Sequence, residues 1–417
     1  LASPDAFAPA EQPGHPLQSL RALLAETRME LPADLPPMAA GLFGYLGYDM
    51  VRAVEKLGDP PPDPLDLPDA ILLRPTITAI FDNVRDELTL ITPVWPRGDV
   101  SAESAYAEAQ ARLDKALASI ARPIAEPPRL PVAADAKIES NTAHADYLKI
   151  VERAKEYIRA GDVFQVVPSQ RFRRAFPLPA IDLYRALRRL NPSPFLYHLA
   201  LPGFAIVGSS PEILVRLRDG VVTIRPIAGT RPRGATADDD ARLAQELIDD
   251  PKERAEHLML LDLGRNDVGR VAQTGSVRVT ASYFIERYSH VMHLVSNVEG
   301  KIRPGLDAID TLAAGLPAGT LTGAPKIRAM EIIDEFEKEK RGAVYAGAVG
   351  YFAANGSMDT CIVLRTAIVK DGMMYVQAGG GVVADSDPES EFQETVNKAK
   401  ALMAAADEAL SRANEKI

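Results

Sequence analysis

Two pairs of glutamates in the sequence could bind a divalent cation. Glu253 and Glu256 are three residues apart shortly after a proline, and Glu391 and Glu394 repeat this spacing after another proline. Because residues three apart share one face of a helix, each pair would project its carboxylates in one direction. Mg²⁺ usually takes one or two carboxylates together with water and substrate oxygens. The alternative is structural, since acidic side chains near a helix N-terminus also stabilise the helix dipole.

Two glycine-rich segments could hold an anion. Gly379, Gly380 and Gly381 follow a strand-like run, and successive backbone N–H groups there could form an anion-binding nest. The segment 319–326 superficially resembles a phosphate-binding loop, but Pro325 precedes its lysine and isoleucine stands where Ser or Thr is required. We therefore reject nucleotide binding. Tight turns that need a positive φ are the structural alternative for these glycines.

Three single residues have chemistry that the sequence leaves open. His293 lies in an apolar run, where an imidazole is either a buried structural residue or a proton carrier. Arg365 has apolar neighbours, and a buried arginine needs an anionic partner, either a structural carboxylate or a substrate. Cys361 shares the predicted strand of Arg365 and lacks the paired base and sharp turn of a cysteine nucleophile. We expect it to be a small core residue.

The elements that must position these residues are helices and strands in hairpin order. Helices are expected at 102–120, 141–159, 181–190, 306–314 and 324–337, as two segments flanking Pro251 within 237–262, and as a long final helix after Pro388. Strands are expected at 70–81, 87–94, 164–172, 195–207, 213–218, 221–224, 275–280, 343–353, 359–369 and 373–378. This order predicts an antiparallel α+β fold.

Proline also marks the predicted domain organisation. Residues 122–139 are rich in proline and are the best candidate for a linker. We expect an N-terminal region at residues 1–121, intertwined with the catalytic core, and a catalytic domain at residues 140–417. Because the sequence begins with leucine, we expect the N-terminal region to be truncated at its start.

Composition excludes several classes of protein. Of the 417 residues, 47 are Lys or Arg and 57 are Asp or Glu, and a formal charge of −10 argues against non-specific nucleic-acid binding. The single cysteine cannot form an internal disulfide or a cysteine-based metal site, which favours the reducing cytoplasm. Residues 1–17 lack the pattern of a signal peptide and the sequence has no apolar run of roughly 18 residues, so no membrane association is expected.

Five ordered motifs resemble those of the chorismate-utilising enzyme family. They are 226–234 (PIAGTRPRG), 253–267 (ERAEHLMLLDLGRND), 290–296 (HVMHLVS), 316–328 (LPAGTLTGAPKIR) and 378–398 (AGGGVVADSDPESEFQETVNK). The likeness extends from about Gly41 nearly to the C-terminus. It implies an α+β fold in which two large antiparallel β-sheets form a sandwich flanked by helices, with the active site between the sheets.

The resemblance also implies roles for individual residues. Glu212 would be the general acid at a departing ring hydroxyl, His293 would assist a later proton abstraction, and Thr230 would join them in the catalytic group. Substrate would be held by Ala228, Gly229, Thr230, Tyr345, Arg365, Gly379, Gly380, Gly381 and Lys398. Mg²⁺ would be coordinated by Glu256 and Glu394, with Glu253 and Glu391 close by.

Two positions favour one branch of the family. Isochorismate- and salicylate-forming members place a lysine base where Gln165 stands; water must lose a proton to attack, whereas ammonia already carries its lone pair. Many aminodeoxychorismate-forming members carry a nucleophilic lysine where Ala228 stands. The resemblance therefore favours conversion of chorismate and ammonia to anthranilate and pyruvate, the first committed step of tryptophan biosynthesis. The alternatives are an aminodeoxychorismate-forming component of folate synthesis and a non-catalytic amino-acid-binding subunit.

The resemblance also implies a partner and a regulator. Because Cys361 lacks the surroundings of a glutaminase nucleophile, a separate glutamine amidotransferase subunit would supply the ammonia, in a heterotetramer of two copies of each subunit. The run Asn191, Pro192, Ser193, Pro194 and Phe195 resembles part of a tryptophan feedback site. Its usual N-terminal companion, a Leu-Leu-Glu-Ser motif, is absent, so feedback inhibition stays open.

Overall fold

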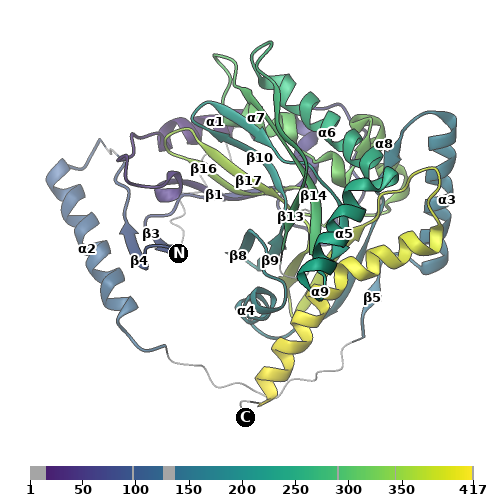
Figure 1. The fold of residues 1–417 in the computed structure, drawn as a ribbon. Helices are drawn as coiled ribbons and strands as arrows, with labels where there is room; N and C mark the ends of the chain where they lie inside the picture. Colours follow the sequence, from purple (N-terminus) through teal and green to yellow (C-terminus); the bar gives the residue numbers. More distant parts are fainter. Residues whose placement is uncertain (1–15, 96–97, 125–136, 289–290, 343, 416–417) are drawn as a thin grey trace.

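Two large antiparallel β-sheets organise the chain in the computed structural model, which describes residues 16–95, 98–124, 137–288, 291–342 and 344–415 (Figure 1). The nine-stranded sheet has the order β12 (Ile227–Pro232), β14 (Val291–Lys301), β11 (Val221–Ile224), β10 (Ile213–Arg218), β17 (Met358–Ile362), β16 (Ala348–Ala353), β1 (Gly41–Leu46) and β2 (Ala70–Leu73), with β13 (Arg278–Arg287) paired to β14. The six-stranded sheet has the order β5 (Glu139–Ser140), β7 (Ser169–Ala175), β19 (Met373–Gly379), β18 (Thr366–Lys370), β9 (Phe204–Ser210) and β8 (Phe195–Leu201). The fold class expected from the sequence is confirmed.

Most helices cover the outer faces of both sheets and the ends of the sandwich, whereas α2 lies apart from both large sheets (Figure 1). They are α1 (Pro16–Thr27), α2 (Ala102–Ile120), α3 (His144–Ala160), α4 (Ala180–Leu190), α5 (Ala237–Asp249), α6 (Pro251–Val271), α7 (Ala308–Gly315), α8 (Lys326–Phe336) and α9 (Pro388–Glu415). Two short pairs complete the description: β6 (Gln165–Val166) with β15 (Gly323–Ala324), and β3 (Thr78–Asp82) with β4 (Glu87–Ile91). No helix within the described ranges is long and apolar enough to cross a membrane.

Alternating side chains build three apolar layers. On β9, Ile206 packs between the two sheets while its neighbour Val207 packs beneath α4 and α9. On β1, Tyr45 likewise faces the space between the sheets and Leu46 joins the core beneath α6 and α7. Because successive strand residues point to opposite faces, each central strand buries both of its faces, and the result is a helix–sheet–sheet–helix sandwich.

The chain passes between the sheets at two neighbouring crossings. One crossing leads from β9 to β10 through Glu212, and the other leads from β17 to β18 through Arg365. They are joined by the backbone, since the N–H of Ile362 donates to the Glu212 carbonyl at 3.0 Å and that of Ser209 donates to the Arg365 carbonyl at 3.2 Å. Arg365 has a φ of 47°, an uncommon conformation for a non-glycine residue.

Several strand predictions were wrong in one respect: they joined two strands into one. The segment 359–369 is β17 and β18, in different sheets, so Arg365 lies between strands and not within one. Segments 70–81, 164–172 and 195–207 are also divided, the second at Pro168. A continuous apolar run does not reveal where a buried strand changes sheets.

The helices follow the sequence more closely. α2 has the predicted bounds, and α3 ends where Gly161 adopts a φ of 84° as its cap. The predicted linker at residues 122–139 lies mostly outside the described residues. β1 and β2 come from the N-terminal region and join the nine-stranded sheet. The division into two regions stays a prediction.

Candidate active site

Glu212 lies at the first crossing between the sheets. Its carboxyl is surrounded by protein atoms and borders a small cavity of about 40 Å³ that Thr320 also lines. Burial raises the pKa of Glu212 to about 7, although Arg365, Lys398 and the neighbouring Thr320 hydroxyl pull it down. A carboxyl with such a pKa is partly protonated at neutral pH, so Glu212 can act as a general acid.

Arg365 lies at the second crossing, close enough to Glu212 for the two charges to interact. Burial lowers the pKa of its guanidinium, and the charges of Glu212 and Tyr288 oppose that effect. Among the described residues, no carboxylate forms an ion pair with Arg365. A largely buried guanidinium without such a partner is a binding group for a ligand carboxylate.

His293, on β14, is held by the neighbouring strand β12. Its Nδ1 lies 2.9 Å from the carbonyl oxygen of Gly229 and 3.1 Å from Oγ1 of Thr230. Since a carbonyl oxygen can only accept, Nδ1 carries the proton in this arrangement and Nε2 is the basic nitrogen. Burial lowers the pKa of the imidazole, which keeps it neutral and able to accept a proton at neutral pH.

A β-bulge at Gly229 makes this arrangement possible. The register of β12 against β14 shifts between Ala228 and Thr230, and Gly229 has a φ of 61°. A Cβ on Gly229 would lie 2.8 Å from Cδ1 of Leu247 and 2.9 Å from Oε2 of Glu253. Only glycine therefore fits between His293 and the predicted metal ligands. Ala228 itself is buried on β12.

The four predicted metal ligands come from α6 and α9, which cover different sheets. Burial raises the pKa of Glu256, and the carboxylates of Glu253 and Glu394 raise it further. Burial also raises the pKa of Glu391, with a contribution from Glu394. The two helices thus bring like charges close enough to repel one another.

The four carboxylates do not form a compact metal site in this structure. No group of three or more His, Cys, Asp or Glu side chains that could hold a metal ion occurs within the described part of the chain. Glu394 instead contacts Nζ of Lys398 at 2.7 Å, and Glu253 contacts Arg231 at 3.2 Å. The donor set still fits a hard cation, since Oε2 of Glu391 is buried with no hydrogen-bond partner among the described residues.

The predicted glycine segment leaves β19 and is tightly enclosed. A Cβ on Gly380 would lie 2.9 Å from Oε2 of Glu391, and one on Gly381 would lie 2.4 Å from Nε2 of Gln165. Lys398 donates to the Gly379 carbonyl at 2.9 Å. The Gly380 N–H donates to the Pro168 carbonyl at 3.3 Å, so it is already engaged within the protein. The segment mainly allows other groups to approach its backbone closely.

Gln165, Tyr345 and Cys361 are also buried near these segments. Gln165 is 5% exposed, and its Oε1 has no hydrogen-bond partner among the described residues. The hydroxyl of Tyr345 would lie 3.0 Å from a Cβ on Gly379. Burial raises the pKa of the Cys361 thiol to about 12, so the expectation of a core residue is confirmed.

The segment predicted to resemble a tryptophan site connects α4 to β8. Ser209 donates its hydroxyl to the Asn191 carbonyl at 2.5 Å. Phe195 pairs with Ser210, two residues before Glu212. Its proposed regulatory role stays a prediction.

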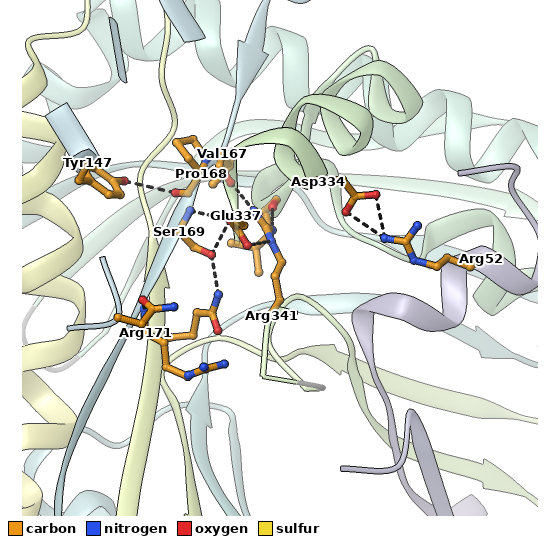
Figure 2. A network of polar contacts seen from close by, with 12 residues as sticks. Arg52, Tyr147, Val167, Pro168, Ser169, Arg171, Asp334, Glu337 and Arg341 are labelled. Atoms are coloured by element: carbon orange, nitrogen blue, oxygen red, sulfur yellow. Dashed lines mark hydrogen bonds and ion pairs between the residues drawn. The ribbon is translucent and has the colours of Figure 1, made fainter. Parts of the chain in front are cut away.

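Sequence reasoning missed two buried ion pairs beside the site. Arg341 and Glu337 form the centre of a polar network (Figure 2), and Lys326 contacts both carboxylate oxygens of Asp267 at 2.9 Å. Lys326 and Asp267 lie in two of the motifs that carry the resemblance, and Lys326 also in the rejected phosphate loop, but no pairing between them was predicted. Arg341 and Glu337 stand in a strongly charged run that is typical of an exposed surface, so no local signal indicated their burial.

Comparisons with known proteins place this chain in a family. The chain matches the chorismate binding enzyme family over residues 5–404. It is 62% identical over 405 residues to anthranilate synthase component 1 of Cereibacter sphaeroides, which covers 97% of this chain and 80% of the relative. The chain belongs to the chorismate binding enzymes.

Solved structures agree with this family. Anthranilate synthase component I from Streptococcus pneumoniae TIGR4 superposes with a TM-score of 0.83 at 40% identity, covering 92% of this chain and 85% of that one. MenF, the menaquinone-specific isochorismate synthase from Escherichia coli, has a TM-score of 0.72 at 23% identity, covering 94% and 82%. The second likeness shows the shared fold alone.

The ionisation of Glu212 can be measured directly. We expect the infrared difference between wild type and Glu212→Gln to reveal one carboxyl that titrates near pH 7. Because Arg365 lowers this pKa, Arg365→Met should raise the midpoint, whereas Arg173→Met, which removes an exposed arginine paired with Glu139, should leave it unchanged. A midpoint near 4.5, or a lower one in Arg365→Met, would contradict this description of the site.

The same shift has a consequence for stability. Since the folded pKa of Glu212 exceeds the ordinary value of 4.5, protonation of this carboxyl favours folding. This contribution to stability is lost as the pH rises from 4.5 to about 7. The free energy of unfolding of wild type should therefore fall relative to Glu212→Gln over that interval.

Proposed function

We propose that this chain is the ammonia-using component of an anthranilate synthase, which converts chorismate and ammonia to anthranilate, pyruvate and water. The supporting observation is the pair of crossings between the sheets. They place Arg365 beside Glu212, whose pKa is about 7. Arg365 is largely buried and has no ion-pair partner within the described part of the chain. A relative 62% identical and a structural relative 40% identical both carry the name anthranilate synthase component I or 1.

The charges of the site suit this substrate. Chorismate carries two carboxylates, and its burial requires matching cations. Arg365 supplies one partner at the crossing, and Lys398 lies beside the start of the glycine segment, where it donates a hydrogen bond to the Gly379 carbonyl. Tyr345 approaches the glycine segment at Gly379 and is the proposed contact for the substrate ring.

Glu212 carries out the first step. Ammonia attacks a ring carbon of chorismate, the ring double bonds shift, and the hydroxyl leaves as water after receiving the proton of Glu212. Hydroxide is a poor leaving group, so this protonation lowers the barrier. The resulting Glu212 carboxylate lies in the field of Arg365 and Lys398. Gln165 cannot deprotonate water, which agrees with ammonia as the nucleophile.

His293 serves the second step. Its Nε2 accepts the ring proton of the amino intermediate while the bond to the enolpyruvyl oxygen breaks. The ring becomes aromatic, and the released enol takes up a proton to become pyruvate. The bonds of Nδ1 to Gly229 and Thr230 hold the ring in the tautomer that this role needs.

The acidic cluster would hold Mg²⁺. Glu256 and Glu394 are the proposed ligands, with Glu253 and Glu391 beside them, and the ion would neutralise a substrate carboxylate when bound. Ammonia would come from a glutamine amidotransferase subunit, and we propose two copies of each subunit in the complex. The aminodeoxychorismate-forming reaction is the second candidate, disfavoured by Ala228.

Product identity tests the proposal. With chorismate, Mg²⁺ and ammonium salts but no second subunit, we expect a fluorescent aromatic product, anthranilate, together with an equal amount of pyruvate. Glutamine in place of ammonium should give no product. Accumulation of a non-aromatic 4-amino compound would favour the second candidate, and no turnover at all would favour a binding subunit.

Metal binding can be tested without turnover. We expect Mg²⁺ to raise the melting temperature of wild type and to have little effect on Glu394→Gln or Glu256→Gln, which remove a charge with little change of shape. Activity of both variants should fall by about 100-fold or more. Glu389→Gln is the matched control, since Glu389 lies in the first turn of α9, five residues before Glu394, but contacts His144 at the surface. If Mg²⁺ changed the melting temperature equally in wild type and all three variants, Glu394 and Glu256 would have only a structural role.

A further inference from the structure

A buried ion pair between Arg341 and Glu337 lies at the C-terminal end of α8, next to segments of the proposed site. The side chains of Arg341 and Glu337 are 2% and 6% exposed. Two hydrogen bonds join them, from Nε at 3.0 Å and from a terminal nitrogen at 2.7 Å. Removing two charges from water is costly unless their remaining groups are also satisfied, so the other contacts of the pair are informative.

Glu337 extends towards the glycine segment. Its Oε1 accepts from both the backbone N–H and the hydroxyl of Ser169, each at 2.8 Å (Figure 2). Ser169 begins β7 and pairs with Gly379, the last residue of β19. Gln377, also on β19, donates to the same serine hydroxyl at 2.8 Å. The carboxylate therefore fixes the strand end from which the glycines leave.

Arg341 extends to two other segments. It donates to the Leu321 carbonyl at 2.7 Å and to the Val167 carbonyl at 2.6 Å. Leu321 follows Thr320, which lines the cavity beside Glu212, and Val167 lies two residues after Gln165. One guanidinium thus holds the backbone that follows Thr320, beside the proposed general acid, and the backbone that follows Gln165.

An aromatic contact adds a third link. The Arg341 guanidinium lies 5.0 Å from the ring centroid of Tyr48 and 5.6 Å from that of Tyr345, within the range of cation–π attraction. Tyr345 is a proposed substrate-binding residue, and its hydroxyl approaches Gly379. The pair thereby contacts the segments that carry Thr320, Gln165, Ser169 and Tyr345.

We propose that Arg341 and Glu337 are positioning residues that set the geometry between the Glu212 acid and the Gly379–Gly381 segment. The proposal rests on the proposed function for its catalytic consequence. The pair touches no reacting atom; it acts through Thr320, Gln165, Ser169 and Tyr345. A rigid frame of this kind matters because displacement of reacting groups by about 1 Å can cost on the order of 100-fold in rate.

Two arginine–carboxylate pairs whose acidic residues lie on α8 or at its C-terminal cap provide a matched test of the proposal. Arg52 binds Asp334, one turn before Glu337, and that pair points away from the site segments (Figure 2). We would compare Arg341→Lys with Arg52→Lys, since both keep the charge and lose the guanidinium fork. Amide exchange of segments 320–323 and 379–382, measured on the free protein, should accelerate about tenfold or more in Arg341→Lys only.

Kinetics then measure the consequence. With chorismate and ammonium, kcat of Arg341→Lys should fall by about 10- to 100-fold while Arg52→Lys stays near wild type. Equal exchange in the two variants, or equal kcat at matched stability, would overturn the proposal. If wild type itself does not turn over chorismate, the proposed function fails, and the exchange data alone decide whether the pair positions these segments.

A second variant keeps the test decisive if Arg341→Lys does not fold. Ser169→Ala removes one arm of the network and leaves the ion pair intact. Exchange should accelerate at 379–382 and remain unchanged at 320–323, because the latter segment is held through Leu321. Unchanged exchange at 379–382 would contradict the proposed link between Glu337 and the glycine segment.

Discussion

The site depends on the electrostatic interaction between Glu212 and Arg365, which lie at two adjacent crossings between the sheets and do not form an ion pair with each other. A carboxyl beside an arginine usually loses its proton readily, because the ion pair favours the charged form. Here the effect of burial exceeds that of Arg365, and the pKa of Glu212 is about 7. The Arg365 guanidinium is therefore available to bind a ligand carboxylate. Backbone hydrogen bonds join the two crossings and hold the backbones of Glu212 and Arg365 next to each other. An acid and an anion-binding cation therefore coexist in one buried place.

The surrounding elements supply the other groups in complementary ways. The bulge at Gly229 gives His293 a fixed tautomer and at the same time admits Glu253. Helices α6 and α9 cover different sheets yet bring their carboxylates together, so a bound cation would join the two layers of the sandwich. Arg341 and Glu337 link the strand ends on the remaining side. The site is thus built where the layers meet.

The sequence predicted those features of the fold that interactions between neighbouring residues determine, such as the ends of helices. The end of α3 at Gly161 and the bounds of α2 follow from capping and composition. Arg365 was recognised as a buried cation, but its place between two sheets depends on long-range pairing that an apolar run does not encode. Glu212 was identified only through resemblance, since its raised pKa comes from the tertiary environment. Arg341 was missed because segments distant in sequence bury it.

Proton uptake on substrate binding tests the central claim most directly. When a chorismate carboxylate pairs with Arg365, that cation should lower the pKa of Glu212 less, so Glu212 should take up a proton. Calorimetric titration without ammonia, at about pH 7.5 in buffers of different ionisation enthalpy, measures this uptake. The account predicts uptake of up to one proton per chorismate in wild type and none in Glu212→Gln. Binding without uptake, or equal uptake in both proteins, would contradict it.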